Sequence, residues 1–432
     1  MTTAAQSRAL SPHNPATRAP MALLALLWLL AAVGLAVLGY RFVAGLGVTR
    51  LGTVVPWGAW VSFYIFFIGL SAGSFLLSTL IFVFRMEKLE PIGRLALLQA
   101  FACLALGMAF IFIDLGHWGR AWHIMVYPQW GSILAWESWL YVGYLAIIAG
   151  ETWLLMRCDL SQWAKATKGL PARIYRTLAF GFQCPADAAG KADCDRRAAK
   201  HIRLLALIGI PVALGVHGGT GAIFAVVKAR PGWNGPLFPL VFIVSALVSG
   251  GGLLMFLRAF VMPDPRTDRE TMPLIAKLTV GFLVFDLTLM LLEFLVGIYG
   301  GIPDHLAVFR RIAVGPFWYI FWILQLLIGA VIPLLMLSRK GGYHPKRMGI
   351  AGLLIVAGIL GVRMNIVIPA LSVPVFRGYD IAINSARMNW LYVPNWIEWL
   401  SSLGVIAAAA LVFLWAVRRL PMSEHQPYSG AD

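Results

Sequence analysis

A dense set of titratable side chains, six of them candidates for chemistry, lies in the short stretch from Ile111 to Tyr144, in a sequence with only 12% charged residues. The stretch ends one long apolar segment, crosses an aromatic loop and begins a second apolar segment. If both segments cross a membrane, these groups lie at one depth near one face, where ionisable side chains are costly and usually functional. The six residues are Asp114, His117, Arg120, His123, Glu137 and Tyr141.

These residue types suit the exchange of electrons and protons with a lipid-soluble quinone. A quinol releases protons as it gives up electrons, so its site needs hydrogen-bond partners at both ring oxygens and an exit for the protons. Imidazole, carboxyl and phenol groups supply such partners, while Trp118, Trp122 and Trp136 would line an apolar slot. His217, within LGVHGGTGAIFA, is expected near the same face. We therefore predict a quinone site formed by His217 and the six residues above.

Simpler interpretations stay open for four of these residues. His117, Arg120 and His123 would also fit at the level of the lipid headgroups, with the neighbouring Trp residues as an aromatic belt. His217 would also serve as one half of a hydrogen bond between two membrane helices.

The composition excludes an ordinary soluble protein. Hydrophobic residues make up 60% of the 432 positions and charged residues 12%, against roughly 45–50% and 25% in soluble domains. Lys and Arg number 35 against 19 Asp and Glu. They cluster between apolar spans, where they set membrane topology, so we predict no nucleic-acid binding.

The four cysteines give no sign of a metal centre. Cys103, Cys158, Cys184 and Cys194 form no CxxC, no CxxCH and no ferredoxin spacing. We therefore predict no iron–sulfur cluster and no c-type haem in this chain. Cys184 and Cys194 are interpreted as unpaired loop thiols, with a bridge or a metal site as the alternatives.

The apolar segments predict an all-α, polytopic membrane protein with about ten transmembrane helices, at about 20 apolar residues per crossing. Of the 35 Lys and Arg residues, 25 fall on one side of the predicted membrane. The positive-inside rule then places both termini in the cytoplasm, as expected for a bacterial inner-membrane protein. The predicted spans are 21–43, 57–84, 92–114, 133–156, 202–227, 237–260, 273–299, 314–337, 348–369 and 395–417.

Two similar small-residue motifs indicate an internal duplication. GLSAGSFLL at 69–77 and ALVSGGGLL at 246–254 lie four spans apart and would let helices approach closely. We predict two four-helix bundles, formed by spans 2–5 and 6–9.

The predicted division of the chain is a disordered cytoplasmic tail (1–20), a first span with its outer loop (21–56), a first bundle (57–230) with a cytoplasmic loop (157–200), a second bundle (231–370), and an outer loop, last span and tail (371–432).

A second set of ionisable residues lies within or beside the spans. Asp286 and Glu293 share one helix face, and Arg363 is a plausible counter-charge. Acids placed between two membrane faces are typical of a proton relay. The alternative is a static ion pair between Asp286 and Arg363. The predicted proton path comprises Glu151, Asp286, Glu293, Arg363 and Glu398.

Haem b is not expected, because it needs two axial imidazoles at matched depth. Only His117 and His217 qualify, and no second pair exists. A chain that handles quinone electrons without its own carrier must exchange them with a partner protein.

Four stretches resemble the NrfD/PsrC family, the membrane subunits of polysulfide-reductase-type respiratory complexes. They are VPWGAWVSFYIFFIGLSAGSFLLS at 55–78, DLGHWGR at 114–120, HGGTGAIFAVVKARPGWNGPLFPLVFIVSALVSGGGLL at 217–254, and YVPNWIEWL at 392–400. The ten-span length and the C-terminal Y-x-P-x-W-x-E pattern look most like the branch of the hydrogenase-2 membrane subunit.

The resemblance implies a haem-free subunit that binds menaquinone or ubiquinone near the outer face, with Asp114, His117 and His217 at matching positions. It also implies a ferredoxin-like iron–sulfur subunit docked on the periplasmic face, which connects to a molybdopterin, nickel–iron or multihaem catalytic subunit. Some relatives are thought to move protons through their bundles. The basic connector 157–203 departs from this pattern and is interpreted as a contact with anionic lipid.

Two other functions compete with a quinone-reactive subunit. An ion-coupled transporter would bind its substrate or ion at Asp286 and Glu293, between duplicated bundles. A purely structural anchor would tether a periplasmic enzyme, but it leaves the cluster of acids and histidines without a role.

Replacing Asp114 by Asn, or His117 by Ala, is expected to abolish quinol-dependent reduction of the partner subunit while the complex still assembles. Each change removes a proton acceptor or hydrogen-bond partner from the predicted site. Turnover of the purified complex with a quinol substrate measures the effect. Normal turnover in both variants would exclude these residues from the site.

Overall fold

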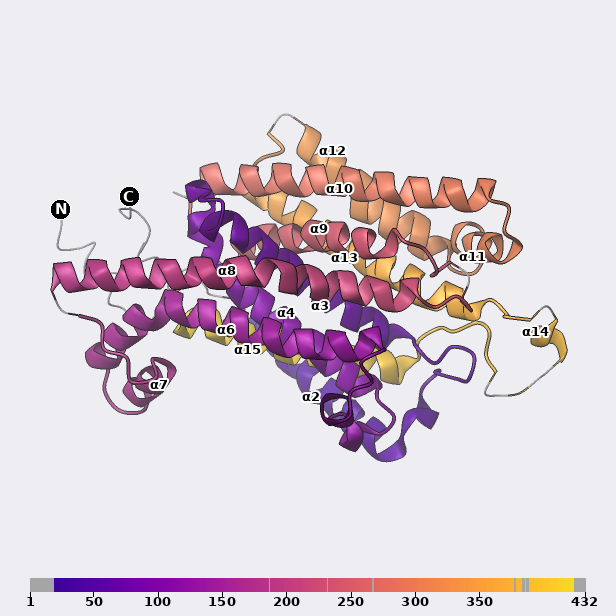
Figure 1. Cartoon of the computed structure of the whole chain (residues 1–432), viewed down its shortest axis with the longest axis horizontal. Coiled ribbons are helices and arrows are strands. Elements are labelled where there is room, and N and C mark those ends of the chain that lie inside the picture. Colours follow the sequence, from indigo (N-terminus) through magenta and orange to yellow (C-terminus); the bar gives the residue numbers. More distant parts are fainter. Residues whose placement is uncertain are drawn as a thin grey trace.

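A computed structural model describes residues 19–422, except 186, 231, 266–267, 340, 377, 383–384 and 386–387. Ten helices in this part are long and apolar enough to cross a membrane, which confirms the predicted all-α, multi-pass architecture (Figure 1). They are α2 (Met21–Ala44), α3 (Ala59–Phe82), α4 (Gly93–Asp114), α6 (Ile133–Ala166), α8 (Ala188–Ala225), α9 (Phe238–Phe260), α10 (Asp268–Tyr299), the π-helix η4 (Ile320–Val331) continued by α12 (Ile332–Ser338), α13 (Pro345–Ser372) and α15 (Trp396–Arg419).

Shorter helices occupy the connectors between these spans. They are η1 (Leu46–Val48), η2 (Glu87–Ile92), η3 (Trp118–Arg120), α5 (His123–Val126), α7 (Leu170–Leu178), α11 (Pro303–Ala313) and α14 (Tyr379–Ala382). Most of the predicted disordered tail, residues 1–18, lies outside the described residues.

The predicted cytoplasmic loop 157–200 is largely helical. α6 continues to Ala166 and α8 begins at Ala188, so only α7 and short turns lie between them. The Asp187 side chain caps α8 by accepting the backbone N–H of Gly190 at 2.7 Å. Both helices therefore continue beyond the predicted apolar spans 133–156 and 202–227, because a helix ends where its capping and packing end, not where its apolar residues do.

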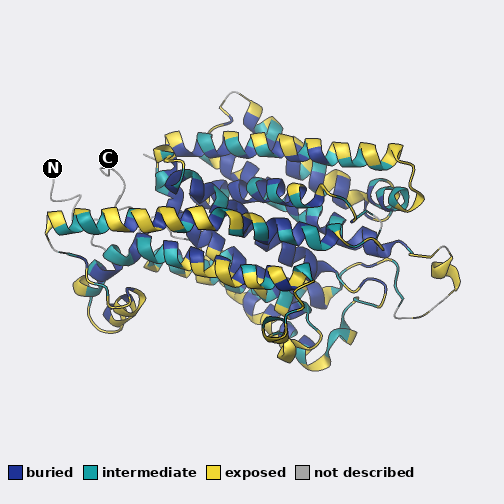
Figure 2. Ribbon diagram, in the orientation of Figure 1, coloured by how far each residue is buried: buried dark blue, intermediate teal, exposed yellow. Residues whose placement is uncertain are grey.

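α3 is the central helix of the molecule, because nearly all of its residues are buried (Figure 2). It packs against α4, α8, α9 and α13. A helix that is hydrophobic on every side is stable only when it is enclosed. α2 and α10, in contrast, bury few of their apolar side chains and expose several, including Trp28 and Phe285, as expected of helices that face lipid.

The two predicted small-residue motifs meet in space, where α3 crosses α9. A Cβ atom added at Gly73 would overlap the carbonyl oxygen of Ala246, and one added at Gly250 would overlap the backbone of Gly73 and Ser74. The two backbones therefore touch directly, which only glycine permits at these positions. The α3–α4–α6–α8 group packs together, as does the α9–α10–η4–α13 group. The duplication itself stays a prediction.

One end of the bundle is called the outer end, following the positive-inside prediction. It carries the connectors 45–58, 115–132, 226–237, 300–319 and 373–395. Hydrogen bonds join these connectors to neighbouring segments. The Asn395 side-chain amide donates to the Val48 carbonyl at 2.8 Å, and the Trp233 indole donates to the Ile366 carbonyl at 2.6 Å.

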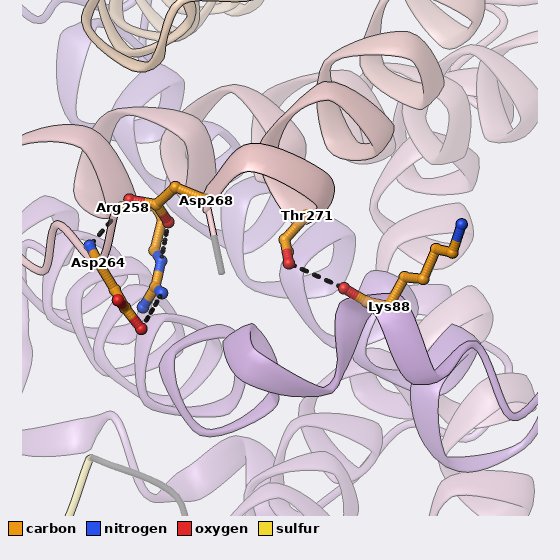
Figure 3. Close-up of polar contacts among 5 residues, drawn as sticks. All are labelled: Lys88, Arg258, Asp264, Asp268 and Thr271. Atoms are coloured by element: carbon orange, nitrogen blue, oxygen red, sulfur yellow. Dashed lines mark hydrogen bonds and ion pairs between the residues drawn. The ribbon is translucent and has the colours of Figure 1, made fainter. Parts of the chain in front are cut away.

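The opposite, inner end is held by buried arginines. Arg258 at the end of α9 contacts Asp268 of α10 at 2.6 Å and Asp264 at 3.5 Å (Figure 3). In the same region the Thr271 hydroxyl donates to the Lys88 carbonyl at 2.9 Å, which ties α10 to η2 (Figure 3). These contacts hold the inner ends of α9 and α10 to each other and to η2.

Replacing Gly73 by Val is expected to destabilise the folded chain by about 1–3 kcal/mol or more, because the added atoms force α3 and α9 apart. Gly39→Val is the matched control, since no atom lies within 4 Å of a Cβ placed there. The unfolding midpoint of the purified protein in detergent measures both. Equal unfolding midpoints for the two variants would show that the close contact between α3 and α9 does not contribute to stability.

Candidate functional site

A buried carboxylate lies one turn inside the outer start of α6. Glu137 and Tyr141 stand one turn apart on the same helix face, and both are buried. The Tyr141 hydroxyl donates to Oε1 of Glu137 at 2.6 Å. The predicted pair from this helix is therefore in direct contact.

Two residues from other helices complete a hydrogen-bond network around this pair. Tyr64 of α3 lies 2.5 Å from the Tyr141 hydroxyl, oxygen to oxygen. Because Tyr141 donates to Glu137, Tyr64 is the donor in this contact. Thr220 of α8 donates a second hydrogen bond to the same carboxylate oxygen. The other oxygen of Glu137, Oε2, is buried and has no hydrogen-bond partner within the described part of the chain.

A second network begins one turn deeper on α8, at His217. Nη2 of Arg363, on α13, lies 3.2 Å from Nε2 of His217 and donates to the Ser245 hydroxyl of α9 at 2.5 Å. The guanidinium also lies over the ring of Phe242, 4.4 Å from its centroid. His217 and Arg363 both approach α3 at Gly69, where an added Cβ would lie 3.1 Å from the imidazole and 3.4 Å from Nη2 of Arg363.

His217 and Arg363 occupy matching sequence contexts. His217 follows Leu-Gly-Val at 214–216, and Arg363 follows the same triplet at 360–362. The two helices, α8 and α13, are the last of their respective groups of four. This match favours the predicted duplication, because equivalent positions in two bundles would meet near the plane between them.

The acids of α10 line a cavity of about 80 Å³ in the second group of helices. Asp286 and Glu293 both border it, together with Gln325 of the π-helix η4 and Asn365 of α13. The Asn365 amide donates to Oε1 of Gln325 at 2.8 Å. Since one water needs roughly 10–15 Å³, the cavity has room for several. π-helical turns are frequent at functional sites.

Asp286 and Arg363 are electrostatic neighbours. However, the ion pairs found among the described residues do not include this pair. Arg363 instead directs its hydrogen bonds to His217 and Ser245. One oxygen of Asp286, Oδ1, is buried without a hydrogen-bond partner in the described part of the chain.

Asp114 lies in a different environment from Glu137. Its charged neighbours are Arg41 of α2 and Glu398 of α15. Arg41 is 1% exposed and donates to the Leu115 carbonyl at 2.8 Å. No hydrogen bond or ion pair found among the described residues joins Asp114 to the Glu137 network. Asp114 therefore has other neighbours than the members of the Glu137 network.

Glu398 caps the start of α15, and both of its oxygens accept hydrogen bonds. The backbone N–H groups of Arg50 and Asn395 donate to Oε2 at 3.1 and 3.0 Å, and the Tyr392 hydroxyl donates to Oε1. Burial, together with the Glu398 carboxyl, raises the pKa of the Tyr392 phenol, so this hydroxyl keeps its proton. The Y-x-P-x-W-x-E pattern thus connects α15 to the start of α3, because the backbone N–H of Ala59 donates a hydrogen bond to the Tyr392 hydroxyl at 2.9 Å.

The remaining predicted residues lie outside both networks. His117, Arg120 and His123 are exposed in the outer connector, where the ring centroid of His123 lies 4.2 Å from that of Trp122. Glu151 is 0% exposed near the inner half of α6, and neither of its oxygens has a hydrogen-bond partner within the described residues.

The sequence pattern missed Tyr64 and Thr220. Tyr64 lies in a helix so uniformly apolar that its pattern marks no functional face, and Thr220 was only part of the HGGTG motif. The described residues include no group of three or more His, Cys, Asp or Glu side chains arranged to hold a metal ion.

Comparison with known proteins identifies relatives along almost the whole chain. The chain is 43% identical to a selenate reductase subunit of Mesobacillus selenatarsenatis, over 92% of this chain and 93% of the relative. It is 29% identical to the Hdr-like menaquinol oxidoreductase integral membrane subunit of Archaeoglobus fulgidus, over 86% of each chain. It is 24% identical to the menaquinone reductase integral membrane subunit of Nitratidesulfovibrio vulgaris, over 89% and 87%.

The family model described as polysulphide reductase, NrfD, matches residues 47–374. This range includes both hydrogen-bond networks and the acidic cavity, and it spans α3 through α13. The chain therefore belongs to the NrfD family of polysulphide-reductase-type membrane subunits.

Proposed function

We propose that the chain is the quinone-reactive membrane subunit of a respiratory oxidoreductase, exchanging electrons between menaquinone or ubiquinone and a partner. Its family membership supports this proposal, as do two relatives named for menaquinol or menaquinone. We place the protein in the bacterial inner membrane with both termini in the cytoplasm, on the distribution of Lys and Arg.

We infer that the quinol releases a proton to the network around Glu137. The observation that carries this inference is the unpartnered oxygen Oε2 of a fully buried carboxylate. Leaving such an oxygen without a partner inside a membrane protein costs free energy, so its persistence favours a ligand or a proton as its partner. The other oxygen is held by Tyr141 and Thr220, which fix the orientation of the carboxylate.

When a quinol binds, its oxidation supplies both the electrons and the protons. Glu137 would accept a proton at Oε2, and the hydrogen-bonded pair Tyr141 and Tyr64 would stabilise the protonated or charged carboxyl through Oε1. The electrons would leave to a partner subunit, since the sequence predicts no carrier in this chain. The three helices that supply these groups keep the distances fixed.

Access to Glu137 requires the outer covering to move, because its side chain is 0% exposed. We assign this movement to the connector 115–132 and the first turn of α6. There Trp130 and Trp136 pack on each other with ring centroids 5.0 Å apart, and both are exposed. Lid-like segments of this kind commonly gate enclosed sites.

We propose a separate role for Asp114, His117, Arg120 and His123 at the edge of the site and toward the partner. Asp114 is partly buried beside Arg41, while the other three are exposed at the outer end. They would guide protons between the quinone site and the outer face, or contact the docked subunit.

Proton movement through the second group of helices is a further part of the proposal. The cavity bordered by Asp286 and Glu293 has space for several waters, and Asp286 has an unpartnered oxygen. Arg363 lies between this cavity and His217. The same cavity is the one observation that favours the alternative, an ion-coupled transporter. Glu151 and Glu398 stay predicted members of the proton path.

We propose that the partners are an iron–sulfur subunit on the outer face and a catalytic subunit beyond it. The most similar of the three relatives described is named as one subunit of a selenate reductase, which implies further subunits. The finer resemblance to the hydrogenase-2 membrane subunit stays a prediction, since the relatives described belong to other reductases.

Replacing Glu137 by Gln is expected to lower quinol-dependent reduction of the partner by at least about a hundredfold, because the amide cannot accept the proton. Turnover of the purified complex with a soluble menaquinol analogue measures the effect. Glu87→Gln, an exposed change of the same kind at the inner end, is the matched control. Wild-type turnover in an assembled Glu137→Gln complex would remove this network from the reaction.

Purification of the chain in mild detergent is expected to retain a subunit that contains iron–sulfur clusters. The physical reason is that a chain without its own carrier must keep its electron partner close. Iron and acid-labile sulfide analysis, with electron paramagnetic resonance, identifies the clusters. If the purified chain oxidised quinol in the absence of any iron–sulfur subunit, this would contradict the proposed partnership.

A further inference from the structure

Three of the four cysteines lie close together at the inner end of the molecule, although they come from three different segments of the chain. The Sγ atom of Cys158 lies 2.7 Å from that of Cys184 and 3.9 Å from that of Cys194. All three are free thiols, and the fourth, Cys103, is buried within α4. Cys158 is thus the shared neighbour of two possible partners.

Each thiol of this cluster comes from a different segment. Cys158 lies on α6, Cys184 in the turn between α7 and α8, and Cys194 in α8. The backbone N–H of Cys184 donates to the Ser161 hydroxyl of α6 at 3.1 Å, which holds the turn against the helix. The fold brings together residues that the sequence separates by 26 and 10 positions.

Arg157 distinguishes Cys194 from the other two thiols. Its Nη2 lies 3.5 Å from the Cys194 Sγ atom. A guanidinium beside a sulfur stabilises the thiolate, which is the reactive form in both oxidation and exchange. Cys158 and Cys194 are partly exposed, whereas Cys184 is buried. A small oxidant in water therefore reaches Cys194 more readily than Cys184.

A metal site does not explain the cluster, because no group of three such side chains is arranged for a metal ion among the described residues. We propose that Cys158, Cys184 and Cys194 form a redox-active thiol cluster, oxidised by a peroxide to a disulfide that moves from Cys158–Cys194 to Cys158–Cys184. This activity is independent of the proposed quinone site, which lies at the opposite end of the bundle.

The steps balance with hydrogen peroxide as the oxidant. The Cys194 thiolate attacks one peroxide oxygen and breaks the O–O bond, which yields a sulfenic acid and, after protonation, one water. The Cys158 thiol then attacks the sulfenic sulfur and forms the Cys158–Cys194 bond, and its proton leaves with the second oxygen as water. Two thiols thus lose two electrons and two protons, and the peroxide takes up both.

Cys184 completes the sequence by thiol–disulfide exchange. Its thiolate attacks the sulfur of Cys158, and Cys194 leaves as a thiolate that Arg157 stabilises. The resulting Cys158–Cys184 bond ties the segment that contains α7 to α6. Because the inner end is predicted to face the reducing cytoplasm, the thiols are expected to be reduced until an oxidant appears.

The experiment uses the full chain in isolated membranes, first reduced and then exposed to hydrogen peroxide. After the remaining thiols are alkylated, peptide mass spectrometry identifies the linked cysteines. The expected product is a Cys158–Cys184 link that dithiothreitol reverses, with Cys103 alkylated only after denaturation. Free thiols at all three positions after peroxide treatment would overturn the proposal, and this measurement on the unaltered chain needs no variant.

Three variants separate the roles within the cluster. Cys194→Ser is expected to slow formation of the Cys158–Cys184 link by about tenfold, because peroxide then has to react with a thiol that has no guanidinium hydrogen bond from Arg157. Cys158→Ser is expected to abolish every link. Cys103→Ser is the matched control and should behave like the unaltered chain. A Cys184–Cys194 link in the Cys158→Ser variant, or an undiminished rate in Cys194→Ser, would contradict the proposed order.

Discussion

The contact between the backbones of α3 and α9 is the constraint on which the rest of the structure depends. Gly73 and Gly250 remove the side chains that would separate the two helices. Inside a membrane, association relies on close packing and hydrogen bonds, because lipid is as apolar as the helices themselves. The crossing also brings α8 and α13 to the sides of α3, so His217 and Arg363 meet beside Gly69.

Burial then determines what the polar groups do. A buried polar atom is costly unless it has a partner, and most of those near the outer end have one. The exceptions are therefore informative. Asp114, Glu137, Glu151 and Asp286 each keep at least one unpartnered oxygen within the described residues. Glu398 is the opposite case, because its capping interactions occupy both oxygens and explain its place in the C-terminal pattern.

The sequence predicted the candidate site only in part. It identified Glu137 and Tyr141 as a pair from their i, i+4 spacing, and the structure joins them directly. It grouped Asp114 with them by depth and by the family resemblance, and the structure gives Asp114 the charged neighbours Arg41 and Glu398. Tyr64 went unnoticed because nothing in a uniformly apolar helix marks which side faces a carboxylate from a distant segment. The thiol cluster was missed for the same reason, since its members follow no local spacing.

The sequence by itself determined the number of spans and their order, and it predicted the depth of each polar residue. Apolar length and the rise per residue are properties of one helix, and the distribution of Lys and Arg is a property of the connectors. Only the tertiary structure decided which helices are neighbours and which faces they present to each other. That choice depends on packing between segments distant in the chain, as at Gly73 and Gly250. Two residues at equal depth can therefore lie on different sides of a central helix, and no local sequence pattern shows on which side each of them lies.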